Sequence, residues 1–284
     1  MKIYNPTVKY IDGNTVIFGV ANFDLQQTFD CGQAFRWSPL ENGNWCGIAL
    51  GRYLEVGYKN GNIIFYNISL AEYEEKWREY FDIDLDYSAI IEQISQNEIL
   101  KKAATQNKGI RILKQDSWEA LCSFIISQNN NIPRIKGIIE RLCSEFGEKI
   151  YGGYAFPTAK TLASLTPEDL APIKCGFRAR YIIDGAKKYL NNEINLEIIK
   201  NADTDKAREE LMKIIGVGCK VADCTLLFGF HRLDALPKDV WIKRALDEYF
   251  SGKLPACALP YAGIAQQYLF NFIRHENNKK AEGN

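Results

Sequence analysis

Several residue types that mark particular protein classes are scarce in this 284-residue chain. It has only two histidines, and neither His231 nor His275 has another ligand at metal spacing, so a catalytic zinc site is not expected. The longest apolar stretches, such as 124–126, are far too short to cross a bilayer. Residues 1–10 lack the charged start and apolar core of a signal peptide. We therefore expect a soluble, cytoplasmic protein that is not inserted in a membrane.

A charge excess and paired cysteines are also absent. The chain has 35 Lys and Arg against 35 Asp and Glu, so its net charge does not indicate a nucleic-acid partner. A local basic patch would still suffice for a few phosphate contacts. None of the eight cysteines forms a CxxC pair, and without a secretory signal we expect them to be reduced.

The apolar periodicity predicts a β-rich part followed by a helical part. Alternating segments separated by Asp-Gly and Asn-Gly turns predict an antiparallel sheet before residue 70, with strands at 15–20, 45–50, 53–56 and 63–66. Helical spacing then takes over, with Asp116 as the expected cap of one helix and a further helix over 132–146. Pro167 suits the first turn of another helix.

The predicted fold class is therefore α+β, with a small antiparallel β-sheet domain packed on a larger, mostly helical one. We expect a β-rich domain with trailing helices at 1–110 and a helical domain at 111–274. The polar residues 275–284 are expected to form a flexible tail.

A glycine pair separates two predicted helices in the second half of the chain. The first helix is expected over 206–215, and the second starts near Cys219. The intervening Gly216-Val217-Gly218 lets the backbone turn sharply and leaves amides uncovered at a helix start, where they can bind a phosphate oxygen. This unit resembles the helix-hairpin-helix motif of DNA-binding proteins, although a plain αα-corner has the same pattern.

Two ionisable residues near this hairpin suit covalent chemistry. Lys220 lies in the first turn of the second helix, where the helix dipole disfavours a cation and its apolar neighbours act in the same direction. A neutral amine can attack a sugar carbon, but a lysine that binds phosphate or faces solvent fits equally. Asp239 offers a carboxylate at the start of a later helix, where it could also be a simple N-cap.

Residues 216–224 and Pro237-Lys-Asp239-Val together resemble the helix-hairpin-helix DNA glycosylase superfamily, in its 8-oxoguanine DNA glycosylase/AP lyase branch. Segments 31–37, 124–134 and 263–270 are similar to that branch's N-terminal signature, asparagine-rich loop and base-pocket helix. Each segment alone also has an ordinary structural explanation, as a turn glycine, a polar helix end or a core aromatic. The four motifs in order over residues 15–274 favour the family.

The resemblance implies a bifunctional, monomeric enzyme that flips a damaged nucleotide out of double-stranded DNA. Lys220 would attack the sugar anomeric carbon and form a Schiff base, and Asp239 would stabilise the positive charge that develops as the base leaves. Cleavage of the strand by β-elimination would follow. The implied substrate is 8-oxoguanine, preferably opposite cytosine. No cofactor is implied as necessary, although hairpin carbonyls could hold a monovalent or divalent cation.

The resemblance also assigns a base pocket. The carbonyl of Gly32 would accept a hydrogen bond from the N7–H that 8-oxoguanine has and guanine lacks. With guanine bound, this buried carbonyl would stay unpaired, at a cost of about 1–3 kcal/mol. Gln266 would read the Watson–Crick edge, while Phe270 and Cys224 would sandwich the ring.

The remaining implied residues contact DNA outside the pocket. Asn129 would fill the vacated stack, and Phe177 would wedge into the duplex. Arg134 and Arg178 would read the orphaned cytosine. The hairpin residues Gly216, Val217 and Gly218 would contact phosphate.

Some positions depart from the family pattern. Trp241 replaces a phosphate-contacting histidine, Cys219 replaces a hydroxyl residue, and Pro133 could shift Arg134. An iron–sulfur cluster is excluded because only Cys257 follows Cys224. A non-catalytic helix-hairpin-helix DNA-binding protein and a glycosylase for another damaged base stay open as alternatives.

Overall fold

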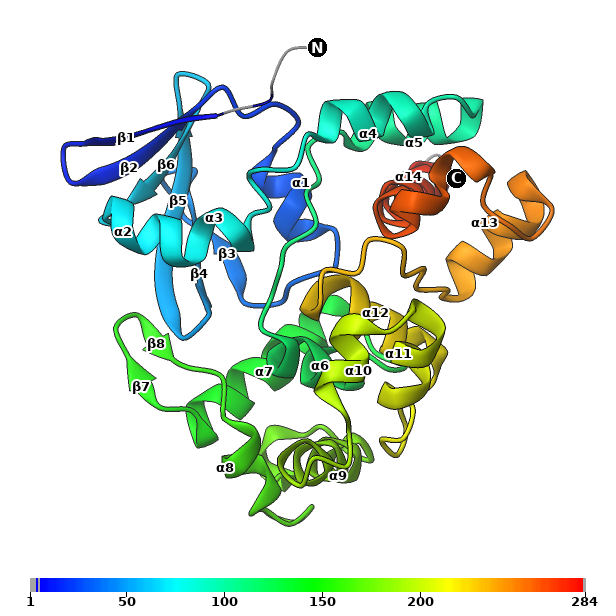
Figure 1. The fold of residues 1–284 in the computed structure, drawn as a ribbon. Coiled ribbons are helices and arrows are strands. Elements are labelled where there is room, and N and C mark those ends of the chain that lie inside the picture. The colour runs from blue at the N-terminus through cyan, green and yellow to red at the C-terminus, as the bar shows by residue number, and fades with distance from the viewer. Residues whose placement is uncertain (1–3, 5, 283–284) are drawn as a thin grey trace.

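The computed structural model describes residue 4 and residues 6–282. A six-stranded antiparallel sheet occupies one side of the molecule and helices form the rest (Figure 1). The strand order is β1-β2-β6-β5-β4-β3. The strands are β1 (Thr7–Ile11), β2 (Asn14–Phe18), β3 (Trp37–Pro39), β4 (Trp45–Ala49), β5 (Arg52–Lys59) and β6 (Asn62–Tyr66). The α+β fold class predicted from the sequence is thus confirmed.

The sheet contains two strands that the periodicity does not reveal. Strand β1 is almost entirely exposed at the sheet edge, so it has no apolar alternation, and β3 is three residues long and ends in Pro39. Between them, Asp24 caps the short helix α1 (Leu25–Asp30) by accepting a hydrogen bond from the amide of Gln27. Phe29 on this helix stacks on Trp37 with the ring centroids 4.2 Å apart, which fixes the chain that follows α1 against the sheet.

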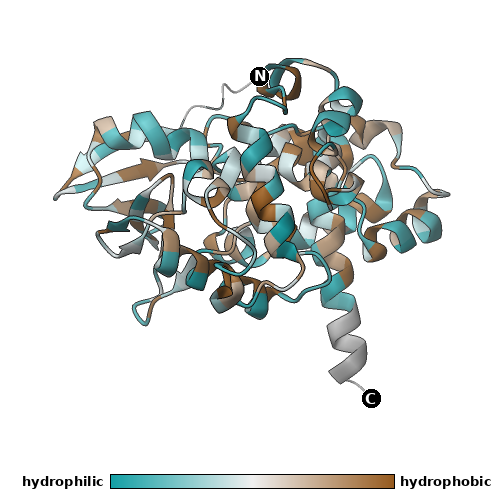
Figure 2. Cartoon of the chain, turned by 90° about the horizontal axis from the view of Figure 1, so that it is seen from below, coloured by the Kyte–Doolittle hydropathy of each residue, from teal (hydrophilic) through white to brown (hydrophobic). Residues whose placement is uncertain are grey.

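The helical part packs around a single large core. Helix α6 (Ser117–Ile126) is capped by Asp116 as predicted. Helix α7 (Ile132–Phe146) confirms the helix predicted over 132–146. In Figure 2 hydrophobic and hydrophilic segments alternate along many of the helices. The first half of the helices comprises α2 (Leu70–Glu72), a π-helical turn (Tyr73–Trp77), α3 (Arg78–Tyr80), α4 (Tyr87–Ile94), α5 (Glu98–Asn107), α6 (Ser117–Ile126) and α7 (Ile132–Phe146). The second half comprises α8 (Ala159–Ala163), α9 (Arg178–Leu190), α10 (Leu196–Asn201), α11 (Thr204–Leu211), α12 (Cys219–Gly229), α13 (Val240–Phe250) and α14 (Ala262–Glu282), with 3₁₀ turns at Ala171–Ile173 and Ala256–Tyr261. A two-stranded hairpin, β7 (Lys149–Ile150) and β8 (Gly153–Tyr154), follows α7.

Helices α4 and α5 pack in the helical core although the sequence suggested them as the end of the N-terminal domain. Tyr87, Ile90 and Leu100 belong to the same buried cluster as residues of α12 and α14. Asn107 at the end of α5 donates a hydrogen bond to the carbonyl of Tyr268 on α14. Figure 1 shows α4, α5 and α14 together on one side of the molecule. The end of α5 and the middle of α14 therefore meet directly although they are 161 positions apart.

Three local predictions were wrong. The helix before the glycine hairpin, α11, ends at Leu211 rather than at 215, because the chain turns through 212–216. Residues 167–170 form turns followed by a 3₁₀ turn at 171–173, not an α-helix. The segment expected to be a polar tail is helical as far as Glu282, and 283–284 lie outside the described residues.

Candidate active site

A small cavity brings together both proposed catalytic residues and all four proposed base-pocket residues. Its volume is about 60 Å³. It is lined by Cys31, Gly32, Phe124, Lys220, Cys224, Phe228, Pro237, Asp239, Gln266, Gln267 and Phe270. These residues come from the turn after α1, from α6, from α12 and the segment that follows it, from the cap of α13, and from α14. Elements more than 200 positions apart in the chain therefore build one site.

Lys220 lies in the first turn of α12, as predicted. Its Nζ donates a hydrogen bond to Ser127 Oγ over 3.3 Å and lies 5.5 Å from the centre of the Phe124 ring. Ser127 in turn donates to the carbonyl of Phe124 over 2.8 Å. The amine is thus held by a hydroxyl group and an aromatic face.

Asp239 caps α13, because its Oδ1 accepts a hydrogen bond from the amide of Ile242 over 2.8 Å. This bond fixes the carboxylate and leaves its second oxygen for another role. Burial raises the pKa of the Cys224 thiol to about 11, with Lys220 opposing this rise and Asp239 adding to it. Cys224 is therefore a neutral thiol near physiological pH, within electrostatic range of both catalytic candidates.

Gln266 presents an unsatisfied polar atom at the cavity. Its side chain is buried, and Oε1 has no hydrogen-bond partner within the described part of the chain. Leaving a buried acceptor unpaired costs about 1–3 kcal/mol, so such an atom in a cavity indicates a site for a donor. Phe270, one turn further on α14, is only partly buried and lines the same cavity.

The two glycines of the hairpin have different surroundings. Gly216 has a φ of +77°, and a Cβ there would lie 2.4 Å from the Tyr181 ring, so only glycine fits. Gly218 is the N-cap of α12, and a Cβ there would meet nothing within 4 Å. Open space thus lies beside the amides that begin the helix carrying Lys220.

The asparagine-rich loop is supported by one of the two arginines proposed to read cytosine. Asn129 is exposed and has a positive φ of +46°. Arg178 is buried and donates to the carbonyls of Gln128 and Asn129, with Nε 3.0 Å from the former. Burial lowers the pKa of Arg178, and Arg134 lowers it further. Arg134 itself is exposed, so the structure gives the two arginines different surroundings.

Two exposed aromatic side chains lie next to proposed site residues in the chain, Phe177 beside Arg178 and Trp241 close to Asp239. Phe177, the proposed wedge, is 46% exposed, and the Arg178 guanidinium lies 4.4 Å from its ring centre. Trp241 is 47% exposed in the first turn of α13, with the Arg244 guanidinium 5.6 Å from its ring centre. Trp241 and Arg244 therefore stand beside Asp239 as an exposed aromatic and cationic pair.

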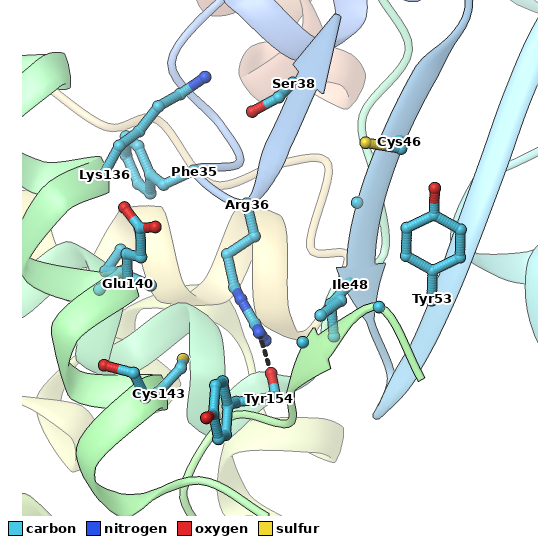
Figure 3. A pocket seen from close by; sticks show the side chains of 15 residues that line it. Phe35, Arg36, Ser38, Cys46, Ile48, Tyr53, Lys136, Glu140, Cys143 and Tyr154 are labelled. Atoms are coloured by element: carbon cyan, nitrogen blue, oxygen red, sulfur yellow. Dashed lines mark hydrogen bonds between the residues drawn. The ribbon is translucent and has the colours of Figure 1, made fainter. Parts of the chain in front are cut away.

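A larger cavity of about 440 Å³ lies elsewhere, between β4, α7 and the β7–β8 hairpin, and contains none of the predicted site residues (Figure 3). Arg36 projects into it and donates to the carbonyl of Tyr154. Its Nη1 lies 3.6 Å from Glu119, which makes an ion pair without a good hydrogen bond. Phe35 lines this cavity and contacts Phe124 of the small cavity edge to face. The catalytic candidates, not the volume, identify the smaller cavity as the site.

Sequence reasoning missed several residues that line the cavity or contact a residue that does. Ser127 and Gln267 lie inside motif segments but were given no role, because a hydrogen-bond partner distant in sequence leaves no periodic signal. Phe228 and Pro237 were not assigned to the cavity either. Among the described residues, no group of three or more His, Cys, Asp and Glu could hold a metal ion, and no helix is long and apolar enough to span a membrane.

Two family models cover most of the chain in succession. The N-terminal domain of 8-oxoguanine DNA glycosylase matches residues 15–121, and the HhH-GPD superfamily of base excision DNA repair proteins matches 122–254. The crystal structure of the Clostridium acetobutylicum 8-oxoguanine glycosylase/lyase, in complex with double-stranded DNA containing cytosine opposite 8-oxoG, is 39% identical. The superposition has a TM-score of 0.88 and covers 98% of this chain and 100% of that one.

The chain belongs to the 8-oxoguanine DNA glycosylase family. The structure of MBOgg1 with a low-affinity DNA ligand is also 39% identical, with a TM-score of 0.89 over 96% of this chain and 99% of that one. The N-glycosylase/DNA lyase of Saccharomyces cerevisiae is 38% identical over 182 residues, which is 58% of this chain and about half, 48%, of the yeast protein. The family predicted from the four motifs is confirmed.

Proposed function

We propose that this protein excises 8-oxoguanine, preferably opposite cytosine, from double-stranded DNA and then cleaves the strand as an AP lyase. The observation that carries the proposal is the shared cavity of Lys220 and Asp239 with Gln266 and Phe270. The similarity to a glycosylase/lyase over the full length of that protein supports it. A DNA-binding module without catalysis would need the hairpin but no lysine and carboxylate in one cavity.

The first chemical step joins the enzyme to the sugar. The Nζ lone pair of Lys220 attacks C1′, and the bond from C1′ to N9 of 8-oxoguanine breaks, with its electron pair leaving on the base. Positive charge develops on the sugar as this bond lengthens. The carboxylate of Asp239, fixed by its hydrogen bond to Ile242, stabilises that charge in a site from which water is largely excluded.

Strand cleavage follows from the covalent adduct. Opening of the sugar ring gives a protonated imine between Lys220 and C1′. Loss of a proton from C2′ then expels the 3′ phosphate, and water finally hydrolyses the imine to free the amine. An alcohol or thiol nucleophile could not form this imine, so the proposed lyase step depends on Lys220.

Recognition in the cavity would follow hydrogen-bond complementarity. The carbonyl of Gly32 accepts the N7–H of 8-oxoguanine, and Gln266 pairs with the Watson–Crick edge. Phe270 and Cys224 hold the ring from its two faces. A cavity of about 60 Å³ holds only a few water molecules, so its lining must open before a purine can enter.

The proposed DNA contacts lie outside this cavity. Hairpin amides at 216–218 bind phosphate, Phe177 wedges, Asn129 fills the vacated stack, and Arg134 with Arg178 faces the orphaned cytosine. The reaction needs no cofactor, and a cation held by hairpin carbonyls would add positive charge beside a phosphate. We place the enzyme, acting as a monomer, in the cytoplasm, at the nucleoid if the cell is bacterial.

Borohydride trapping on a duplex with one 8-oxoguanine opposite cytosine tests the proposal. The intact protein should form a covalent adduct with the lesion duplex and not with an undamaged one, and Lys220→Ala should form none. Base release without an adduct would exclude the Schiff base. Neither release nor adduct would leave a DNA-binding module or another lesion as the function.

A further inference from the structure

The side chain of Gln267 joins the last helix to the turn that carries Gly32. Its Nε2 donates a hydrogen bond of 2.8 Å to the carbonyl of Cys31, which lies 236 positions earlier in the chain. Gln267 is 3% exposed and lines the small cavity next to Gln266. The peptide that it holds is the one immediately before Gly32, so the hydrogen bond acts directly on the orientation of that residue.

The residue after Gly32 is fixed from the other side. Gln33 is fully buried, and its Nε2 donates to the carbonyls of Thr28 and Arg111, each over 2.8 Å. Its Oε1 accepts from the amide of Leu113 over 2.9 Å. Gln33 thus ties the end of the turn to the chain at 111–113. Because Cys31 Sγ also donates to the Thr28 carbonyl and accepts from Gln33 Nε2, loss of Gln267 would free the Cys31 carbonyl while the Cys31 side chain stays held.

Gly32 is the flexible point between these two anchors. Its φ of +82° lies in the region that glycine adopts easily, and a Cβ there would meet only Ile132 at 3.8 Å. Gly32 therefore has no side chain whose packing could hold its backbone in place. The direction of the Gly32 carbonyl depends on the hydrogen bonds of its neighbours.

We propose that Gln267 is a positioning residue for lesion recognition, which holds the Cys31–Gly32 peptide so that the Gly32 carbonyl points at N7–H of the flipped base. This inference rests on the proposed function. Because Gln267 acts through Gly32, its loss affects the step that reads the base and not the chemistry of the sugar. A preformed abasic site has no base to read, so it separates the two effects.

The variant Gln267→Met keeps the length of the side chain and removes the donor. We expect its single-turnover excision of 8-oxoguanine to fall about tenfold, the change that corresponds to one hydrogen bond of about 1.4 kcal/mol. Borohydride trapping on a preformed abasic site, which requires Lys220 but no base, should stay within about twofold of the original protein. Equal loss on both substrates, or loss on neither, would overturn the inference.

Asn271 provides a matched control. It is buried one turn further on α14, where it donates to Asn107 Oδ1 over 2.6 Å, away from the Gly32 turn. Asn271→Leu should lower the melting temperature as Gln267→Met does, without changing the ratio of 8-oxoguanine excision to abasic-site trapping. A changed ratio in this control would assign the effect to α14 packing in general and overturn the specific role.

A second variant covers the case in which Gln267→Met does not fold. In Gln267→Glu the ionised carboxylate cannot donate to the Cys31 carbonyl, whereas the protonated acid can. For each protein, the rate of 8-oxoguanine excision is divided by the rate of abasic-site trapping. As the pH is lowered, this ratio should rise in Gln267→Glu relative to the original protein, because the acid becomes protonated. A flat ratio would contradict the role of the donor. If the original protein itself neither excises nor traps, the proposed function fails instead.

Discussion

The hydroxyl oxygen of Ser127 lies 3.3 Å from the Nζ of Lys220, and the hydroxyl donates a hydrogen bond to the carbonyl of Phe124. The hydroxyl is therefore an acceptor for the amine, which it orients at the edge of the cavity. Ser127 comes from the end of α6 and Lys220 from the start of α12, so the packing of these two helices sets the position of the Lys220 amine, the proposed nucleophile.

The variant Ser127→Ala should slow formation of the trapped adduct about two- to tenfold, because one neutral hydrogen bond contributes about 0.5–1.5 kcal/mol. Single-turnover borohydride trapping on 8-oxoguanine and on an abasic site should show the same loss, since both use the amine. Ser123→Ala, a buried change one turn earlier on α6, is the control and should leave both rates unchanged. Unaltered trapping by Ser127→Ala would show that the amine needs no such support.

Asp239 combines a structural and a chemical role that two substitutions can separate. Asn can still accept the hydrogen bond from Ile242, so Asp239→Asn should keep the melting temperature while base excision falls about 100-fold or more. Asp239→Ala should lose excision and also about 1 kcal/mol of stability through the missing cap. Denaturant unfolding and single-turnover excision measure the two effects. Full excision by Asp239→Asn would remove the carboxylate from the mechanism.

The two hairpin glycines should respond differently to alanine. Gly216→Ala places a Cβ against Tyr181 at positive φ and should lower stability by about 1–3 kcal/mol. Gly218→Ala meets open space and an extended backbone, so the fold should tolerate it. Binding to an abasic-site duplex should weaken in Gly218→Ala, because the new methyl group lies where a phosphate would approach the amides. Unchanged affinity would place the DNA elsewhere.

The two arginines near the asparagine-rich loop should also differ. Arg178→Ala removes buried hydrogen bonds to the carbonyls of Gln128 and Asn129 and should lower the melting temperature. Arg134→Ala changes an exposed side chain and should leave the melting temperature unaltered, while excision loses preference for cytosine over adenine opposite the lesion. Thermal unfolding and excision from the two duplexes test this. An unchanged melting temperature in Arg178→Ala, or a lowered one in Arg134→Ala, would contradict this difference.

Glu119 should give the stability a pH dependence. Burial raises the pKa of Glu119 to about 7, and Arg36 opposes the rise. A carboxyl whose pKa is higher in the folded state destabilises the fold as it ionises, so this cost is absent below about pH 4.5 and complete above about pH 7. Glu119→Gln should therefore gain stability, relative to the original protein, between pH 5 and pH 8 in urea unfolding. An equal stability difference between Glu119→Gln and the original protein at pH 5 and at pH 8 would contradict this role of burial.

Periodicity predicted those elements whose burial repeats regularly. The helix over 132–146 agrees with the structure because it buries one face. The helix that follows the Asp116 cap and four of the strands agree because their apolar segments are largely buried. Strand β1 was missed because an exposed edge strand has no such pattern. The turn at 212–216 was missed because its residues have helical propensity, and the sharp reversal at Gly216 is a tertiary effect.

The site was predicted from motifs rather than from physics alone. Lys220, Asp239, Gln266 and Gly32 share a cavity as the resemblance implied, whereas each taken alone had an ordinary structural explanation. Gln267 and Ser127 could not be assigned, because their partners lie 236 and 93 positions away. Contacts at such separations become visible only when the chain is folded.

The hydrogen bond between Gln267 and the Cys31 carbonyl also has a consequence for synthesis of the chain on the ribosome. During synthesis, the hairpin and Lys220 leave the ribosome before α14, which completes the base pocket, exists. A partly synthesised chain, or one that has lost α14 to proteolysis, would therefore carry the proposed nucleophile without the residues proposed to select a base. On this proposal, selectivity is acquired last, when α14 packs against the turn at Gly32.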